Sequence, residues 1–289
     1  MIPAAFDYVA PRSLPEATAE LLKHGQEAKV LAGGHSLIPL MRLRLSTPSF
    51  LVDIGRVKDL NYIKEVDGHL AFGTLTTHHD IAFSDVVKRK LPMLASAAHQ
   101  IGDPAVRNRG TIGGAAAHAD PNGDYPACLL ALDATFVVVG PRGERTIAAK
   151  DFFVDTFTSA LEPDEILREV RVPVVEGSKG TYLKFSRRSQ DWAIVAVGVQ
   201  VHLTGQTVDR VAIGLTSMGS TPLRAAAVEA ALKGKAASHD AIRAASERAA
   251  EGLNPPQDLS ASPDYRRHLA TVLTRRALQQ VIGNQTSPS

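Results

Sequence analysis

The stretch Ala32-Gly33-Gly34-His35-Ser36-Leu37 decides the fold of this chain, together with Thr111-Ile112-Gly113-Gly114 further along. The first paired glycine lies between a short apolar run typical of a buried strand and a run typical of a helical turn. Glycine lets a backbone approach a ligand closely and adopt positive φ. Successive N–H groups in such a turn, with the Ser36 hydroxyl, can bind an anion such as a pyrophosphate. A purely structural Gly-Gly turn is the alternative.

The second glycine pair repeats this chemistry, with an adjacent hydroxyl and no acidic residue in the motif. It lies in a poorly periodic segment, Gly102 to Asn122, which we expect to be one long loop. Long structureless loops inside compact domains are usually functional, although a flexible loop is the alternative here. Neither motif is a G-x-G-x-x-G or a P-loop. The sequence therefore argues against a Rossmann domain and against a P-loop nucleotide hydrolase.

The flanking sequence predicts an α+β architecture. A Ser13-Leu14-Pro15-Glu16 capping box begins the first helix, which Gly25 can end. The interval 173–180 is rich in Pro, Gly and Ser, so we expect a domain 1–176, with subdomains of about 1–54 and 55–176, and a second domain 177–289. We expect strands at 29–32, 50–54, 69–73, 134–139, 181–186, 193–203 and 208–216, and further helices at about 37–41, 78–90, 92–100, 124–132, 222–233, 239–252 and 263–283.

Composition narrows the class of protein. The 289 residues, 44% hydrophobic and 21% charged, are typical of a soluble globular chain of two domains. A formal charge of +2 does not indicate a nucleic-acid partner. The single cysteine, Cys128, excludes an iron–sulfur cluster held by this chain alone, since such clusters need about four thiolates. The start has no signal pattern, and no apolar run approaches the roughly 20 residues of a membrane span, so we expect a cytoplasmic protein.

The two glycine motifs, in this order, resemble those of the FAD subunit of the xanthine dehydrogenase family of molybdenum hydroxylases. The similarity is greatest to the medium subunit of aerobic carbon monoxide dehydrogenase, and it extends over essentially the whole chain. Three further stretches strengthen it, namely Met1-Ile2-Pro3, Ser36-Leu37-Ile38-Pro39-Leu40-Met41 and Asp120-Pro121-Asn122-Gly123-Asp124-Tyr125-Pro126-Ala127.

The resemblance implies a vanillyl-alcohol-oxidase-type FAD-binding fold: two α/β subdomains plus a C-terminal domain of a three-stranded antiparallel sheet and three helices. It also implies an electron-transfer role. FAD would take electrons from a small 2Fe–2S subunit, which receives them from a large molybdopterin subunit where substrate, with carbon monoxide favoured, is oxidised. The resemblance further implies that the three subunits assemble as a dimer of heterotrimers and that a quinone is the external electron acceptor. It also implies that the complex lies at the inner face of the membrane.

The resemblance also assigns cofactor-binding residues. It places backbone donors for the pyrophosphate and ribityl oxygens in Ala32, Gly33, Gly34, His35, Ser36 and Leu37 and in Thr111, Gly113, Gly114 and the following Ala115. Asp124 matches an aspartate that binds the same region, with a helix N-cap as the alternative. Leu161 and Lys184 correspond to contacts with the flavin ring, and Ile101 and Gly102 to neighbours of the flavin. For Lys184 the alternative is a solvated strand lysine.

Two positions depart from the family pattern. Ala115 stands where the family usually has asparagine, so we expect weaker FAD binding unless another donor, such as His118, compensates. Trp192 stands where relatives carry a tyrosine that shields one flavin face, and an indole can stack in the same way. Simple core packing is the alternative for this only tryptophan.

Other polar patterns do not indicate a site. Asp120, Asn122 and Asp124 match the first ligand positions of a calcium loop, but the later positions fail. His78-His79 has no nearby ligand set, so we expect no metal site. The basic residues Arg266-Arg267-His268 and Arg275-Arg276 are expected on a solvated face of the last helix, with a partner contact as the alternative.

No residue is expected to act as an acid–base catalyst, because the flavin carries the chemistry. Two other functions stay open from the sequence. One is a stand-alone flavin oxidase with its own organic substrate, and the other is a flavin-free interaction subunit, which Ala115 makes conceivable.

Overall fold

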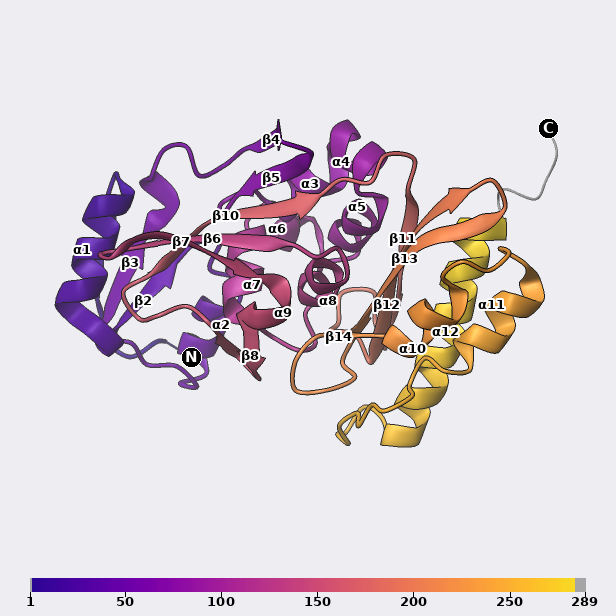
Figure 1. The fold of residues 1–289 in the computed structure, drawn as a ribbon. Coiled ribbons are helices and arrows are strands. Elements are labelled where there is room, and N and C mark those ends of the chain that lie inside the picture. Colours follow the sequence, from indigo (N-terminus) through magenta and orange to yellow (C-terminus); the bar gives the residue numbers. More distant parts are fainter. Residues whose placement is uncertain (1, 284–289) are drawn as a thin grey trace.

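The structure is a computed structural model and describes residues 2–283. Three larger sheets follow one another along the molecule (Figure 1). The N-terminal part lies at one end, and the C-terminal sheet with its helices lies at the other. None of the helices within residues 2–283 has the length and hydrophobicity of a membrane-spanning segment.

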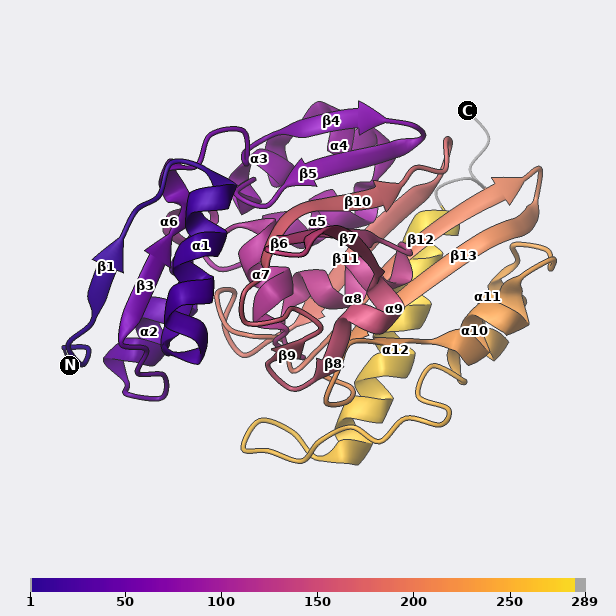
Figure 2. The ribbon, with the colours of Figure 1, turned by 60° about the vertical axis from the view of Figure 1, so that its left-hand side comes forward.

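The N-terminal part is a small parallel sheet in the order β1-β3-β2, with α1 packed along it (Figure 2). The predicted capping box is only half present: the Glu16 N–H donates to the Ser13 hydroxyl (3.3 Å), but the Glu16 carboxylate accepts from the Arg12 N–H (2.9 Å) and not from the N–H of the cap residue Ser13. Gly25, at φ +52°, ends the helix as predicted. The elements are β1 (Asp7–Val9), α1 (Leu14–His24), η1 (Gly25–Glu27), β2 (Ala28–Leu31), α2 (Leu37–Arg42), β3 (Phe50–Asp53) and η2 (Ile54–Arg56).

The central part is a five-stranded antiparallel sheet in the order β4-β5-β10-β6-β7. Its middle strand, β10, comes last in the sequence and is inserted between β5 and β6. The elements are β4 (Ile63–Val66), β5 (His69–Gly73), α3 (His78–Phe83), α4 (Asp85–Lys90), α5 (Pro92–His99), α6 (Pro104–Arg107), α7 (Ile112–His118), α8 (Asp124–Ala131), β6 (Thr135–Gly140), β7 (Gly143–Ala148), α9 (Ala149–Phe152), β8 (Phe153–Asp155), β9 (Thr158–Ser159) and β10 (Ile166–Pro173).

Two expectations for this part are wrong. The single helix expected over 78–90 is two helices, because Ser84 leaves helical geometry and its hydroxyl caps α4 at the Val87 N–H (3.5 Å). The segment expected to be one long loop contains α6 and α7. Asp103 caps α6 at the Val106 N–H (2.8 Å), and Thr111 caps α7 at the Gly114 N–H (3.1 Å). Local capping therefore overrides the poor periodicity.

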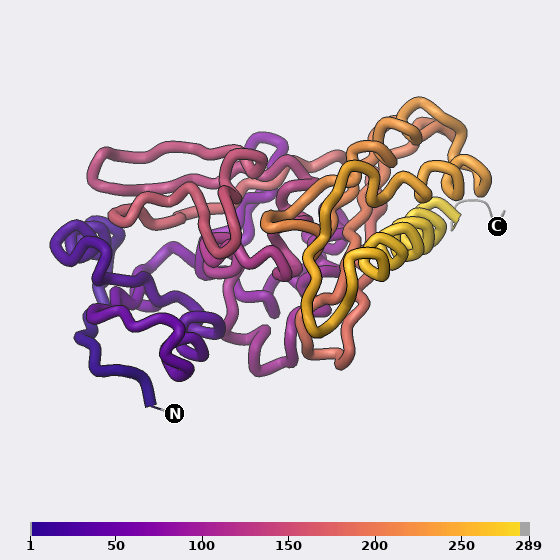
Figure 3. The backbone as a smooth tube through the Cα atoms, turned by 90° about the horizontal axis from the view of Figure 1, so that it is seen from below, coloured from indigo at the N-terminus to yellow at the C-terminus, as the bar shows by residue number. Residues whose placement is uncertain are grey.

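The C-terminal part contains the three predicted antiparallel strands, β11, β12 and β13. A tight turn, in which Gly205 has φ +62°, joins β12 to β13. A two-residue fourth strand, β14, shortens the helix expected from residue 222. Helices α10, α11 and α12 gather on the outer side of the sheet (Figures 1 and 3), and α5 and α8 pack on its inner face. The elements are β11 (Lys179–Phe185), β12 (Val195–Thr204), β13 (Thr207–Thr216), β14 (Leu223–Arg224), α10 (Ala226–Leu232), α11 (His239–Ser246) and α12 (Pro263–Gly283).

Each part has its own buried apolar cluster, but the clusters are not fully separate. The central cluster includes Tyr182 and Ala196 from the C-terminal sheet. Ile166 of β10 belongs to the N-terminal cluster. The domain division near residues 173–180 stays a prediction, and residues 284–289 of the predicted second domain lie outside the described residues.

Candidate cofactor site

The two glycine motifs lie against each other in space, although they are far apart in sequence. A Cβ added to Gly33 would lie 2.2 Å from the Arg109 carbonyl oxygen and 2.9 Å from the Gly110 Cα. Both neighbours are backbone atoms, which cannot move aside easily. A Cβ on Gly114 would lie 3.8 Å from the Ala32 Cβ. Gly33 is therefore required by a backbone-to-backbone contact between the first motif and Arg109-Gly110, the residues that directly precede the second motif.

The first motif presents unpaired donors. Within residues 2–283, the backbone N–H groups from Gly33 to Leu37 have no hydrogen-bond acceptor. The Ser36 hydroxyl precedes α2 but does not cap it, and Gly34 turns the chain at φ +76°. Consecutive free N–H groups on a turn form a concave anion site. This motif fits the pyrophosphate of a dinucleotide.

The second motif has already used its donors. The N–H groups of Ile112 and Gly113 donate to the carbonyls of Thr76 (3.0 Å) and Thr74 (3.1 Å). Those of Gly114 and Ala115 donate to the side chain (3.1 Å) and the carbonyl (3.0 Å) of Thr111. A Cβ on Gly113 would lie 1.7 Å from the Thr74 hydroxyl oxygen. The glycines here permit close packing, and in this arrangement the motif supports the first one and leaves no donor free from 112 to 115.

Ala115 is half-buried and packs against the central core. His118, considered as a compensating donor, packs against Phe157 with ring centroids 5.0 Å apart and the ring planes tilted by 36°. Burial lowers the pKa of its imidazole. The ring is therefore part of the packing and has no free role as a donor in place of the missing asparagine.

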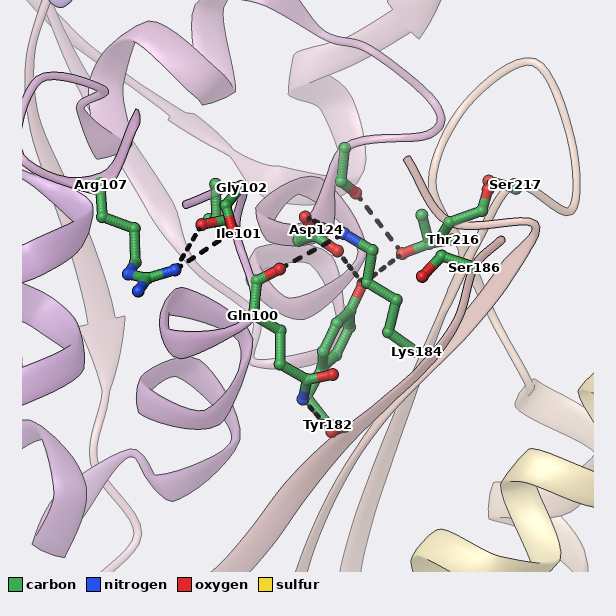
Figure 4. A network of polar contacts seen from close by, with 12 residues as sticks. Gln100, Ile101, Gly102, Arg107, Asp124, Tyr182, Lys184, Ser186, Thr216 and Ser217 are labelled. Atoms are coloured by element: carbon green, nitrogen blue, oxygen red, sulfur yellow. Dashed lines mark hydrogen bonds and ion pairs between the residues drawn. The ribbon is translucent and has the colours of Figure 1, made fainter. Parts of the chain in front are cut away.

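Asp124 and Lys184 form an ion pair in the interior (Figure 4). The Lys184 Nζ lies 3.2 Å from Asp124 Oδ2, and only 4% and 2% of the two side chains are exposed. Lys184 is thus not a solvated strand lysine. Asp124 is not a helix cap either, because Gly123 occupies that position in α8. Burial raises the pKa of the Asp124 carboxyl more than Lys184 and Tyr182 lower it.

Two residues of this network are absent from the sequence prediction. The Tyr182 hydroxyl donates to Asp124 Oδ1 (2.8 Å) and lies 3.4 Å from the Thr216 hydroxyl. Burial raises the pKa of Tyr182 well above its ordinary value, so the phenol stays a donor. Tyr182 lies two residues before Lys184 on β11, and residues at this spacing share a face of a strand. That spacing could have indicated its role.

Ile101 and Gly102 lie beside the ion pair. Lys184 donates to the carbonyl of Gln100 (3.4 Å), the residue before Ile101. The Arg107 guanidinium donates to the carbonyls of Ile101 (3.0 Å) and Gly102 (3.2 Å), as Figure 4 shows. The end of α5 is thereby tied to both β11 and α6.

His78 connects the glycine motifs to the ion pair. The backbone N–H of His78 donates to the Gly110 carbonyl (3.0 Å). The imidazole makes a T-shaped contact with the ring of Tyr125, the residue after Asp124, with ring centroids 5.1 Å apart. Burial lowers the pKa of His78 to about 3, so the ring is neutral. In the described chain, no group of three His, Cys, Asp or Glu side chains could hold a metal ion.

Leu161 and Trp192 lie at the periphery. Leu161 follows β9, is half-buried, and packs against the central core. Trp192 lies between β11 and β12 with 57% of its surface exposed. Core packing, the alternative for Trp192, is therefore wrong.

A cavity of about 400 Å³ lies elsewhere, where Gln200, His202 and Arg210 of the C-terminal sheet face the end of β10 and α10. None of the predicted cofactor residues lines it. The predicted site is thus a surface built from loops and a buried ion pair, and it is distinct from this cavity.

Two family models match the chain. Residues 4–175 match the FAD binding domain in molybdopterin dehydrogenase, and residues 180–281 match the CO dehydrogenase flavoprotein C-terminal domain. The carbon monoxide dehydrogenase medium chain of Hydrogenophaga pseudoflava is 42% identical, over 96% of this chain and 97% of that protein. The glyceraldehyde dehydrogenase medium chain of Sulfolobus acidocaldarius is 38% identical, over 97% of this chain and 100% of that protein.

Solved structures agree with the sequence comparisons. Carbon monoxide dehydrogenase from Hydrogenophaga pseudoflava contains a chain with a TM-score of 0.94 at 43% identity, covering 98% of this chain and 99% of its own. Quinoline 2-oxidoreductase from Pseudomonas putida 86 contains one with a TM-score of 0.93 at 32% identity, covering 99% and 100%. The cofactor is FAD, and the α+β FAD-binding fold is confirmed. The chain belongs to the family of FAD-binding medium subunits of molybdenum hydroxylases, oxidoreductases that include carbon monoxide dehydrogenase.

Proposed function

We propose that this chain takes electrons from a small 2Fe–2S subunit and passes them to an external acceptor such as a quinone, within a carbon monoxide dehydrogenase. The observation that carries the proposal is the row of unpaired N–H groups from Gly33 to Leu37. FAD, when bound, supplies the electron-carrying chemistry that side chains lack. The single buried cysteine supports partners that hold the clusters, because about four thiolates are needed.

The chain's own residues have binding and positioning roles in this proposal. Residues 32–37 hold the pyrophosphate, and the motif at Thr111 supports them from behind. The Lys184 ammonium supplies positive charge near the flavin ring, held in place by Asp124. Trp192 covers one face of the ring and excludes water, and Ile101, Gly102 and Leu161 border it.

Partners and substrate follow from relatives that are medium chains of larger complexes. We assign a large molybdopterin subunit and a small 2Fe–2S subunit as partners, assembled as a dimer of heterotrimers in the cytoplasm, at the inner membrane face. Two carbon monoxide dehydrogenase medium chains, 42% and 39% identical, support carbon monoxide as the substrate. The 38% identity with a glyceraldehyde dehydrogenase medium chain makes an aldehyde the second candidate.

Co-expression with the genes that flank it tests the function. We expect the chain to co-purify with two partners, iron and molybdenum, and the complex to reduce a quinone analogue when carbon monoxide is added. If glyceraldehyde but not carbon monoxide supports reduction of the quinone analogue, the substrate is the aldehyde and not carbon monoxide. A chain that purifies alone and consumes oxygen with an organic substrate would establish a stand-alone oxidase. If the chain shows no flavin absorption after reconstitution with FAD, it is a flavin-free interaction subunit.

A further inference from the structure

The segment that carries Trp192 is exposed but held at one end. It joins β11 to β12, and the Ile194 N–H donates to the Phe185 carbonyl (2.8 Å), which closes its base. Beyond this bond, the carbonyls of Ala193 and Ile194 accept hydrogen bonds from outside the segment. These two carbonyls belong to the residues that immediately follow Trp192, so their partners hold the backbone next to the indole.

One partner is Arg266, expected from the sequence on a solvated face of α12. That expectation is wrong, because the residue is 2% exposed. Its guanidinium donates to the carbonyls of Ile194, Ser217 (3.5 Å) and Pro256 (3.1 Å) and pairs with the Asp258 carboxylate.

The other partner is Ser217, which has a left-handed backbone at φ +63°. Its hydroxyl donates to the Ala193 carbonyl (2.9 Å), and its N–H donates to the Pro121 carbonyl (3.0 Å). Pro121 lies in the loop that leads to Asp124. The residue before Ser217, Thr216, approaches Tyr182 in the Asp124 network, as Figure 4 shows. Ser217 therefore touches both the Trp192 segment and the loop before Asp124.

We propose that Arg266 is a positioning residue, which acts with Ser217 to hold Trp192 in a fixed place relative to Asp124 and Lys184. This inference rests on the proposed contact of these three residues with FAD. It explains a buried charge that stability alone does not favour, because a well-packed apolar side chain is often at least as stabilising there. Arginine has five N–H donors in a planar fork, so it can bind several carbonyls from separate segments at once.

Trp192 is the only tryptophan, so its fluorescence reports on the segment directly in the full chain without FAD. We would measure its anisotropy decay in Arg266→Met and in Ser217→Ala, which removes only the hydroxyl bond to Ala193. The matched control is Arg267→Met, the next residue on the same helix, whose partner is Asp264 at the surface. We expect a larger fast component of the decay in the first two variants and no change in the control.

FAD titration supplies the second measurement. In the two positioning variants, quenching of Trp192 by FAD should decrease. The dissociation constant of FAD should rise about tenfold in Arg266→Met, which loses hydrogen bonds from a charged group, and about three- to fivefold in Ser217→Ala, which loses one neutral hydrogen bond. If both variants fold and keep the wild-type anisotropy decay, the inference is wrong and Arg266 only stabilises the fold. If Arg266→Met does not fold, Ser217→Ala decides. Absence of quenching in the wild-type chain at full occupancy would instead refute the proposed FAD contact of Trp192 and leave the anisotropy result intact.

Discussion

Replacing Lys184 with methionine should strongly destabilise the native chain, because the Asp124 carboxylate would stay buried without its cation. With 2% of its side chain exposed, Asp124 cannot recover hydration in place. Removing one partner of a buried pair costs about 3–5 kcal/mol. We expect a decrease in the free energy of unfolding of about 3 kcal/mol, the lower end of that range, because the Tyr182 hydroxyl still donates to the carboxylate.

The decrease should depend on pH with a definite sign. Burial already raises the pKa of Asp124, and the Lys184 charge opposes that shift, so the variant should have a still higher pKa. A carboxyl group whose pKa is raised in the folded state gives stability that is present below its unfolded pKa and is lost as the pH rises through the folded pKa. The difference between wild type and variant should therefore be largest at neutral pH and shrink as the pH falls toward about 4.

Urea unfolding of the chain without FAD, followed by far-ultraviolet circular dichroism across this pH range, measures the effect. Lys88→Met is the matched control, because Lys88 pairs with Asp85 at the surface, where 49% and 88% of the side chains are exposed. Such pairs contribute about 0–1 kcal/mol. The double variant Asp124→Leu/Lys184→Met should recover most of the lost stability. The reasoning is refuted if Lys184→Met is no more destabilising than Lys88→Met, or equally destabilising at every pH.

Four shorter predictions concern the glycine motifs and their surroundings. Gly33→Ala should abolish stoichiometric FAD binding, measured as the flavin-to-protein ratio, because its Cβ would lie 2.2 Å from a backbone oxygen. Gly219→Ala is the control, because the nearest atom to its Cβ, at 2.9 Å, is the end of the flexible Leu223 side chain. Ala115→Asn should slow FAD dissociation, and an unchanged stopped-flow rate would show that position 115 does not matter. His78→Gln should weaken acid destabilisation in urea unfolding, because a pKa lowered from 6.5 to about 3 gives stability that is lost as pH falls through that window. FAD binding should quench Trp192 fluorescence, and unaltered emission at full occupancy would contradict the proposed stacking.

Local signals account for the parts of the fold that the sequence predicts correctly. The Ser13 cap and Gly25 delimit α1 through hydrogen bonds and φ values within a few residues of each other. Alternating apolar residues mark β12 and β13, and a glycine turn joins them. Two of the wrong expectations, at Ser84 and at Thr111, concern sites where a capping hydroxyl sets a helix boundary that the apolar periodicity does not indicate.

The sequence by itself determined the order of the elements and, by resemblance, the FAD-binding motifs with Asp124 and Lys184 as candidates. Only the tertiary structure decided that the two motifs touch at Gly33, that just the first keeps free donors, and that Lys184 and Arg266 are buried. The physical reason is the distance along the chain over which each kind of interaction acts. Caps and periodicity act between residues close in the chain, whereas desolvation and pairing of a charge depend on segments that only folding brings together.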